Sequence, residues 1–233
     1  GRKGKNLWTN NGDGEKIKVH TAENQVEEAR YVADCVFDDI RNGGSASSHA
    51  VLYRMNAQSA ALENVFARSG VLYTVVGGTR FFDRKEIKDV LAYLQVINNP
   101  DDSLRLKRII NEPKRGIGDT TVKAASDIAE NLSISLFEVL SNAKDYPILS
   151  RSAAKLKTFT DMINSFIELS ANVSINELCE TVVQETGYMN MLILAGKTEQ
   201  DRIENIKELS SSIVQYEMES DEPSLSGFLE EVA

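Results

Sequence analysis

The stretch from Asn111 to Thr121, NEPKRGIGDTT, combines residue types suited to binding an anion. Gly116 and Gly118 flank Ile117, so the backbone can turn tightly and leave its N–H groups uncovered while the isoleucine side chain packs inward. Free amides at the start of the following helix, with the helix dipole behind them, attract an anion. A DNA phosphate fits that description, and a contact of this kind is indifferent to base sequence.

Polar residues of the same stretch agree with this interpretation. Lys114 and Arg115 would add positive charge at the rim, and the hydroxyl groups of Thr120 and Thr121 would donate to the same phosphate. An ordinary tight turn with incidental basic residues explains the composition equally well. The candidate contacts to the DNA backbone are Lys114, Arg115, Gly116, Ile117, Gly118, Asp119, Thr120 and Thr121.

The overall charge requires any such contact to be local. A formal net charge of -9 has the wrong sign for a protein that coats nucleic acid by charge alone. Two cysteines form no disulfide framework, and with two histidines a zinc site is not expected, which favours a reducing, cytoplasmic setting. No apolar run approaches the roughly 20 residues that a membrane span needs.

No catalytic centre is apparent in the chain taken alone. It has no G-x-x-x-x-G-K-[ST] sequence, and the N-terminal GRKGKN follows no strand that would make it a phosphate-binding loop. His20 and His49 flank short strands in a region with few catalytic partners. Paired carboxylates such as Glu27 and Glu28 lie on an expected helix surface, where solvation explains them.

The elements that must position these residues change character near residue 79. Before it, strands 16–20, 49–54 and 71–76 alternate with helices 24–41 and 57–68, which predicts parallel strands with crossover helices in an incomplete α/β unit. After it the periodicity is helical throughout. Asn24, Asp119 and Ser224 occupy N-cap positions. The later helices are expected at 84–98, 103–111, 119–131, 134–142, 150–170, 174–186, 188–196, 199–218 and 224–232.

Five blocks of sequence carry a family resemblance over essentially the whole chain: GRKGKNLWT, LYRMNAQS, GGTRFFDRKEIKD, PKRGIGDTT and RIENIKEL. Together they resemble the UvrD/PcrA/Rep group of superfamily 1 DNA helicases, and its PcrA members most closely. The resemblance implies that residues 1–79 are the N-terminal part of RecA-like domain 2A, with an incomplete sheet. It further implies that residues 80–233 belong to the helical accessory domain 2B, with a helix–hairpin–helix element.

The resemblance also implies roles for particular residues. LYRMNAQS is similar to helicase motif IV, in which Arg54 and Asn56 would lie at the single-stranded DNA track; for Arg54 a salt bridge at a strand end is the alternative. Relatives usually carry arginine where this chain has Ala60, so no charge role is expected there. PKRGIGDTT resembles the element that grips duplex DNA ahead of the fork. Phe81 and Phe82 are expected to pack in the core or hinge rather than to stack on bases.

The activity implied for the intact protein is ATP-dependent 3′-to-5′ DNA unwinding in repair or replication, with ATP and Mg²⁺ as cofactors. The motifs that bind them are not among these residues, so we expect this section to bind neither and to be inactive alone. Domain 2B would bind the duplex backbone at the junction and regulate unwinding. The alternative is an acidic helical module that docks repair or transcription proteins, and salt dependence of DNA binding distinguishes the two.

Overall fold

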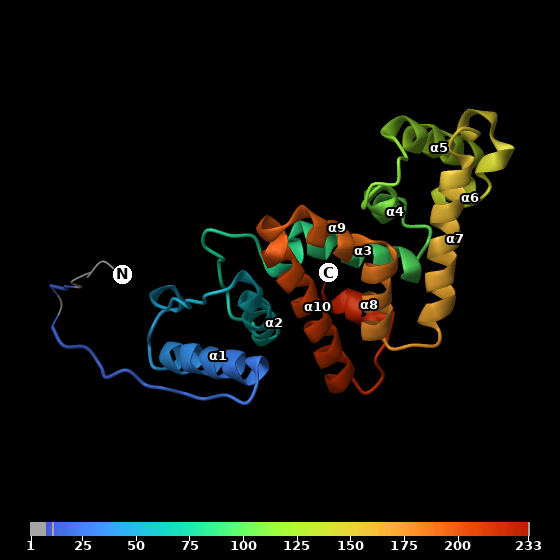
Figure 1. The fold of residues 1–233 in the computed structure, drawn as a ribbon. Helices are drawn as coiled ribbons and strands as arrows, with labels where there is room; N and C mark the ends of the chain where they lie inside the picture. The colour runs from blue at the N-terminus through green and yellow to red at the C-terminus, as the bar shows by residue number, and fades with distance from the viewer. Residues whose placement is uncertain (1–7, 11, 233) are drawn as a thin grey trace.

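The computed structural model describes residues 8–10 and 12–232, and every regular element within them is helical (Figure 1). The α-helices are α1 (Gln25–Arg41), α2 (Ser59–Ser69), α3 (Lys85–Asn98), α4 (Ser103–Ile109), α5 (Asp119–Leu132), α6 (Leu136–Ser141), α7 (Ala153–Ser170), α8 (Ile175–Glu185), α9 (Tyr188–Ala195), α10 (Gln200–Glu219) and α11 (Leu225–Glu231). Short 3₁₀ helices are η1 (Ala46–Ser48), η2 (Asn56–Gln58), η3 (Phe81–Asp83), η4 (Ala143–Asp145), η5 (Pro147–Leu149) and η6 (Lys197–Glu199).

The helices predicted from periodicity are confirmed, with small changes at their ends. Two of the predicted caps form: Asn24 accepts from the N–H groups of Val26 and Glu27, and Ser224 accepts from the N–H of Gly227. The predicted cap at Asp119 is wrong. Gly118 takes the N-cap position in extended conformation, Asp119 is the first helical residue, and no side chain among the described residues caps this helix start.

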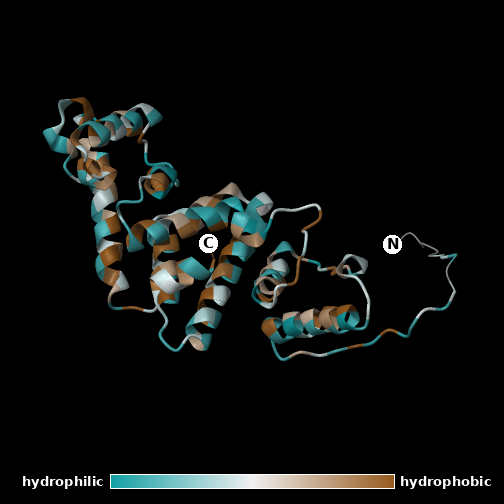
Figure 2. Ribbon diagram, turned by 180° about the vertical axis from the view of Figure 1, so that it is seen from behind, coloured by the Kyte–Doolittle hydropathy of each residue, from teal (hydrophilic) through white to brown (hydrophobic). Residues whose placement is uncertain are grey.

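The three predicted strands, and with them the partial α/β unit, are not found in the part of the chain that the structure describes. Segments 16–20, 49–53 and 71–75 run without regular structure and form no ladder with one another. A helix satisfies its backbone within the segment, whereas a strand exists only beside another strand. Alternating β-rich residues therefore do not suffice here, and hydrophobic residues in these segments stay outside any element (Figure 2).

Two separate hydrophobic clusters hold the helices together. The smaller joins α1 to α2 through Ala29, Ala33, Val65 and Phe66. The larger contains residues from α3 to α11, together with Ala60 and Phe81. Long helix α7 connects the lobe of α4, α5 and α6 to the central helices α3 and α8 (Figure 1).

Ion pairs bridge the two clusters across a cleft between α1, α2, α10 and α11. Arg68 pairs with Glu219, at 2.6 Å, and with Glu231, while Arg30 pairs with Glu219 at 2.9 Å. Glu208 of α10 lines the same cleft. Because these charges come from helices far apart in sequence, the cleft is where the smaller cluster is attached to the larger one.

Candidate nucleic-acid interface

The turn between α4 and α5, residues 110–118, is built around the buried Ile117 side chain and the side-chain amide of Asn111. We call it the Gly-Ile-Gly turn. Ile117 is fully buried, as predicted, and Gly116 adopts a φ of +68°, a conformation that suits glycine. The Asn111 Oδ1 atom accepts from the N–H groups of Arg115, at 2.8 Å, and Ile117, at 3.3 Å. The turn is thus held from inside and leaves its outer surface to solvent.

The start of α5 faces solvent beside this turn. Gly118, Asp119 and Thr120 are exposed, and the Gly118 carbonyl accepts from Thr121 and Val122 of the first helical turn. A Cβ atom added at Gly118 would have the Thr120 hydroxyl as its nearest neighbour, at 3.9 Å, so the space outside the backbone is open. The Asp119 carboxylate in the first turn opposes an incoming anion, and any site here depends on nearby cations to offset it.

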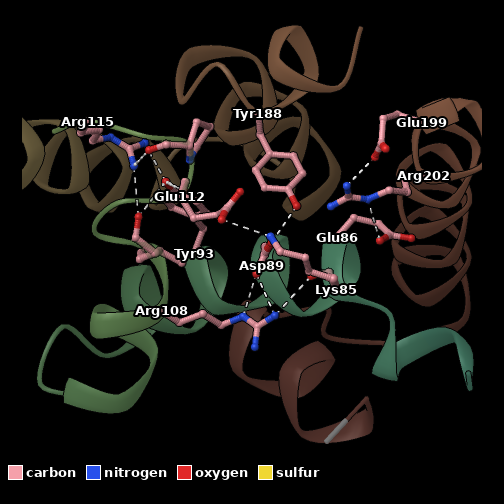
Figure 3. Close-up of polar contacts among 12 residues, drawn as sticks. Lys85, Glu86, Asp89, Tyr93, Arg108, Glu112, Arg115, Tyr188, Glu199 and Arg202 are labelled. Atoms are coloured by element: carbon pink, nitrogen blue, oxygen red, sulfur yellow. Dashed lines mark hydrogen bonds and ion pairs between the residues drawn. The ribbon is translucent and has the colours of Figure 1, made fainter. Parts of the chain in front are cut away.

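Arg115 does not extend along the outer rim, because its guanidinium turns inward (Figure 3). It donates to the carbonyl oxygens of Ile109 and Pro113, both at 3.1 Å, and to the Tyr93 hydroxyl at 2.7 Å. The cation also lies 5.4 Å from the ring centroid of Phe159. Through these contacts, Arg115 holds the turn against α3 and α7.

Two residues of the α7 region, which the sequence did not point to, flank the turn on its outer side. The Lys155 ammonium donates to the Gly116 carbonyl at 3.0 Å, and the Ser152 hydroxyl lies 3.3 Å from that of Thr121. Lys114 and Lys155 are both exposed beside the turn. Lys155 is 39 residues from Gly116 in sequence, and no local pattern could have connected them.

A polar network around the buried Asp89 of α3 supports the inner side of the turn (Figure 3). Asp89 accepts from the Lys85 ammonium at 2.6 Å, the Arg108 guanidinium at 2.8 Å and the Tyr188 hydroxyl at 2.7 Å. Lys85 also pairs with Glu112 of the turn, at 3.1 Å. Burying the Asp89 carboxylate without partners would be costly, and these three donors satisfy it. Because the donors come from α3, α4 and α9, the network fixes these helices relative to one another.

The tyrosines in this network stay protonated. Burial raises the pKa of Tyr93 to about 12, although the Arg115 cation acts in the opposite direction. Burial and the hydrogen bond to Asp89 raise the pKa of Tyr188 as well. Both hydroxyl groups are therefore permanent hydrogen-bond donors near neutral pH, and their part in the site is to hold other groups in place.

Arg54 and Asn56, the candidate single-strand contacts, lie at η2 and are exposed. The backbone N–H of Arg54 donates to the Gln58 side chain at 3.1 Å, and the Asn56 amide reaches Asp201 of α10 at 3.5 Å. Ala60, just after this loop, is fully buried. The η2 loop precedes α2 and packs on α10, while the Gly-Ile-Gly turn lies in the α4–α5 lobe, so the structure does not bring the two sets together (Figure 1).

Other kinds of site find no support in the described residues. Phe81 is buried in the core, as expected, and the rings of Phe81 and Phe82 pack edge to face. Burial raises the pKa of Cys179 to about 12, which leaves it an unreactive thiol. Within 8–10 and 12–232, no cluster of metal-binding side chains and no helix long and apolar enough to cross a membrane is present. The GRKGKN segment lies outside the described residues.

Comparison with known proteins identifies the family. The UvrD-like helicase C-terminal domain family matches residues 1–233. This chain belongs to that family. It is 38% identical over 234 residues to the ATP-dependent DNA helicase PcrA of Bacillus subtilis (strain 168), covering 100% of this chain and 32% of that protein.

Two staphylococcal relatives agree with this assignment. The ATP-dependent DNA helicases PcrA of Staphylococcus epidermidis (strain ATCC 12228) and Staphylococcus aureus (strain NCTC 8325) are each 39% identical over 235 residues. Each alignment again covers 100% of this chain and 32% of the relative. The family membership and the similarity to PcrA confirm the resemblance seen in the five sequence blocks, and the chain spans about a third of the length of these relatives.

Proposed function

We propose that this chain is the DNA-contacting section of an ATP-dependent DNA helicase that translocates in the 3′-to-5′ direction. The observation that carries the proposal is the uncapped, solvent-facing start of α5, with Gly118 at its tip and Lys114 and Lys155 beside it. Backbone N–H groups at a helix start bind phosphate oxygens, and cations beside them add charge-assisted contacts. Because the relatives are named as DNA helicases, DNA is the ligand that we propose for this site.

In this proposal the Gly-Ile-Gly turn and its two helices act as a helix–hairpin–helix element on the duplex backbone. Lys114, Gly118, Thr120 and Thr121 would contact the phosphate, with Lys155 as an additional cation. Gly116 and Ile117 would shape the turn. Arg115 holds the turn from inside, and Asp119 limits the affinity by its charge. Arg54 and Asn56 of the η2 loop would contact the single strand.

The domain assignment is part of the same proposal. Residues 1–79 would belong to RecA-like domain 2A and residues 80–233 to domain 2B, which regulates unwinding at the junction. Support comes from the two hydrophobic clusters, because the buried residues of the smaller lie within 1–79 and those of the larger, apart from Ala60, begin at Phe81. Exposed residues such as Ile17, Leu52 and Leu72 add to it. These would be covered by further strands of the longer protein. ATP and Mg²⁺ would act in the intact enzyme, on residues other than these.

Fluorescence anisotropy with a labelled duplex, measured over a range of salt concentrations, tests the DNA contact. Each phosphate neutralised adds about 0.9 to the slope of log affinity against log salt. We expect Lys114→Ala to weaken binding and to reduce that slope by about 1. Lys157→Ala is the matched control, because it removes an exposed lysine of α7 that pairs with Asp161 of the same helix.

The same titration decides against the alternative function. Binding that is insensitive to salt, or equal in the Lys114→Ala and Lys157→Ala variants, would contradict a phosphate contact at the turn. An acidic module that docks repair or transcription proteins would then account better for a chain with a net charge of -9. A steep slope that only Lys114→Ala reduces would contradict that alternative.

A further inference from the structure

Helix α3 is hydrogen-bonded to both segments proposed as DNA contacts. Its N-terminal end holds the η2 loop, which carries Arg54 and Asn56, and its middle holds the Gly-Ile-Gly turn. The helix itself is the most enclosed element of the larger cluster: Ile87, Val90 and Leu94 are among its fully buried residues. Because α3 is enclosed in the core and hydrogen-bonded at two positions, it can fix the distance between the two segments that it contacts.

Arg84, the N-cap residue of α3, makes the first attachment. Its Nη2 atom donates to the Asn56 carbonyl at 3.0 Å and to the Ser59 hydroxyl at 2.8 Å. Its Nη1 atom donates to Asn205 of α10 at 2.7 Å. Only the planar fork of arginine reaches acceptors on three elements at once, so lysine would keep the charge but lose this arrangement.

Tyr93 makes the second attachment (Figure 3). Its hydroxyl donates to the Glu112 carbonyl at 2.7 Å and accepts from Arg115 at 2.7 Å. The ring is almost completely buried, so this geometry has little freedom. The pair between Lys85 and Glu112 adds a further link between α3 and the same turn.

We propose that α3 is a spacer that sets the separation between the two DNA-contacting segments, with Arg84 and Tyr93 as its positioning residues. These two residues are nine positions apart, which is about 14 Å along a helix axis. The inference rests on the proposed function. When both segments are held at a fixed separation, a DNA with a single strand next to a duplex can occupy them together, and the second contact loses less entropy than a free one.

The test compares three labelled probes by anisotropy: a single strand, a blunt duplex, and that duplex with a 3′ single-stranded tail. We expect the wild-type chain to bind the tailed duplex at least about tenfold more tightly than either simpler probe. In Arg84→Lys and Tyr93→Phe this advantage should fall to about twofold or less, a larger relative loss than either variant shows with the simpler probes. Lys88→Ala, an exposed residue of α3 paired with Asp83, is the control and should keep the advantage.

Hydrogen exchange provides a second measurement on the same variants. Arg84→Lys should speed amide exchange at 56–59 and leave exchange at 111–118 unchanged. Tyr93→Phe should speed exchange at 111–118 and leave exchange at 56–59 unchanged. Binding to both simpler probes without any advantage for the tailed duplex, or an advantage that both variants retain, would overturn the spacer. Binding to neither simple probe would instead refute the proposed function itself, and the spacer with it.

Discussion

Leu52 and Leu94 are the same residue type in two regions of one chain, yet their exposed fractions are 93% and 0%. Leu94 lies on α3 inside the larger cluster, where neighbouring helices cover it. Leu52 lies in a segment without regular structure before η2, in a region whose own cluster consists of a few residues of α1 and α2. The helices from α3 to α11, which we call the helical region, therefore share one core, whereas large apolar side chains of the N-terminal region such as Ile17, Leu52 and Leu72 are exposed.

The largest effect should come from emptying the core of the helical region. Phe166→Ala removes a ring that is 1% exposed, and we expect the free energy of unfolding to fall by about 3–5 kcal/mol. Urea unfolding followed by circular dichroism measures it, with the whole helical region losing stability as one transition.

Phe66→Ala is the matched change in the smaller cluster. It should expose α1 and α2 to hydrogen exchange, while the main unfolding transition changes by less than about 1 kcal/mol because the site is separate from the larger core. An equal loss in both variants would show that the two regions form one cooperative unit, and the comparison between them would fail.

Acid should weaken the attachment between the two regions. Burial tends to raise the pKa of Glu219, but hydrogen bonds from Arg68 and Gln215 outweigh it, and the pKa is lowered. A lowered folded-state pKa stabilises the attachment above the ordinary glutamate value of about 4.3 and loses that contribution as pH falls below it. The Arg68 and Glu219 side chains are partly exposed, and because solvent screens their interaction, the effect is about 1 kcal/mol or less.

Amide hydrogen exchange in α2, measured between pH 6 and pH 3.5 and corrected for the pH dependence of the intrinsic exchange rate, checks this prediction. Wild type should lose protection through the acid range, whereas Glu219→Gln should have lower protection already at pH 6 and little further loss. A wild-type profile that does not depend on pH would contradict the role given to the ion pairs.

The smallest effect should have the opposite sign. Burial raises the pKa of Glu208, which lines the same cleft. A raised pKa favours the neutral acid, so the contribution of Glu208 to stability is present at low pH and is lost as pH rises. Glu208→Gln should then stabilise the chain at pH 7 by about 0.5 kcal/mol or less and have no effect near pH 3.5. Differential scanning calorimetry at both values measures this, and destabilisation at pH 7 would contradict it.

The two regions also differ in how much of their structure could be predicted from the sequence, because a helix forms from local contacts whereas a strand needs a partner strand. Helix positions follow from local periodicity, and helices from α3 to α11 were placed closely. The strands depend on partners, so residues 49–54 carry a strand pattern without forming one. At the candidate site, the burial of Ile117 follows from a tight turn. The inward course of Arg115 depends on Tyr93 and Phe159, which no pattern near residue 115 reveals.

The central claim, that DNA approaches the backbone at the start of α5, is tested most directly by Gly118→Ala. The added methyl meets nothing closer than 3.9 Å and needs no positive φ, so the fold can accept it, unlike a change at Gly116, whose φ is +68° and whose Cβ would lie 2.7 Å from Lys155 Nζ. Gly14→Ala, also in open space, is the control. With thermal unfolding unchanged, the account predicts that duplex affinity falls about tenfold in Gly118→Ala alone, the loss of one charge-assisted contact. Equal affinity in wild type and both variants would contradict it.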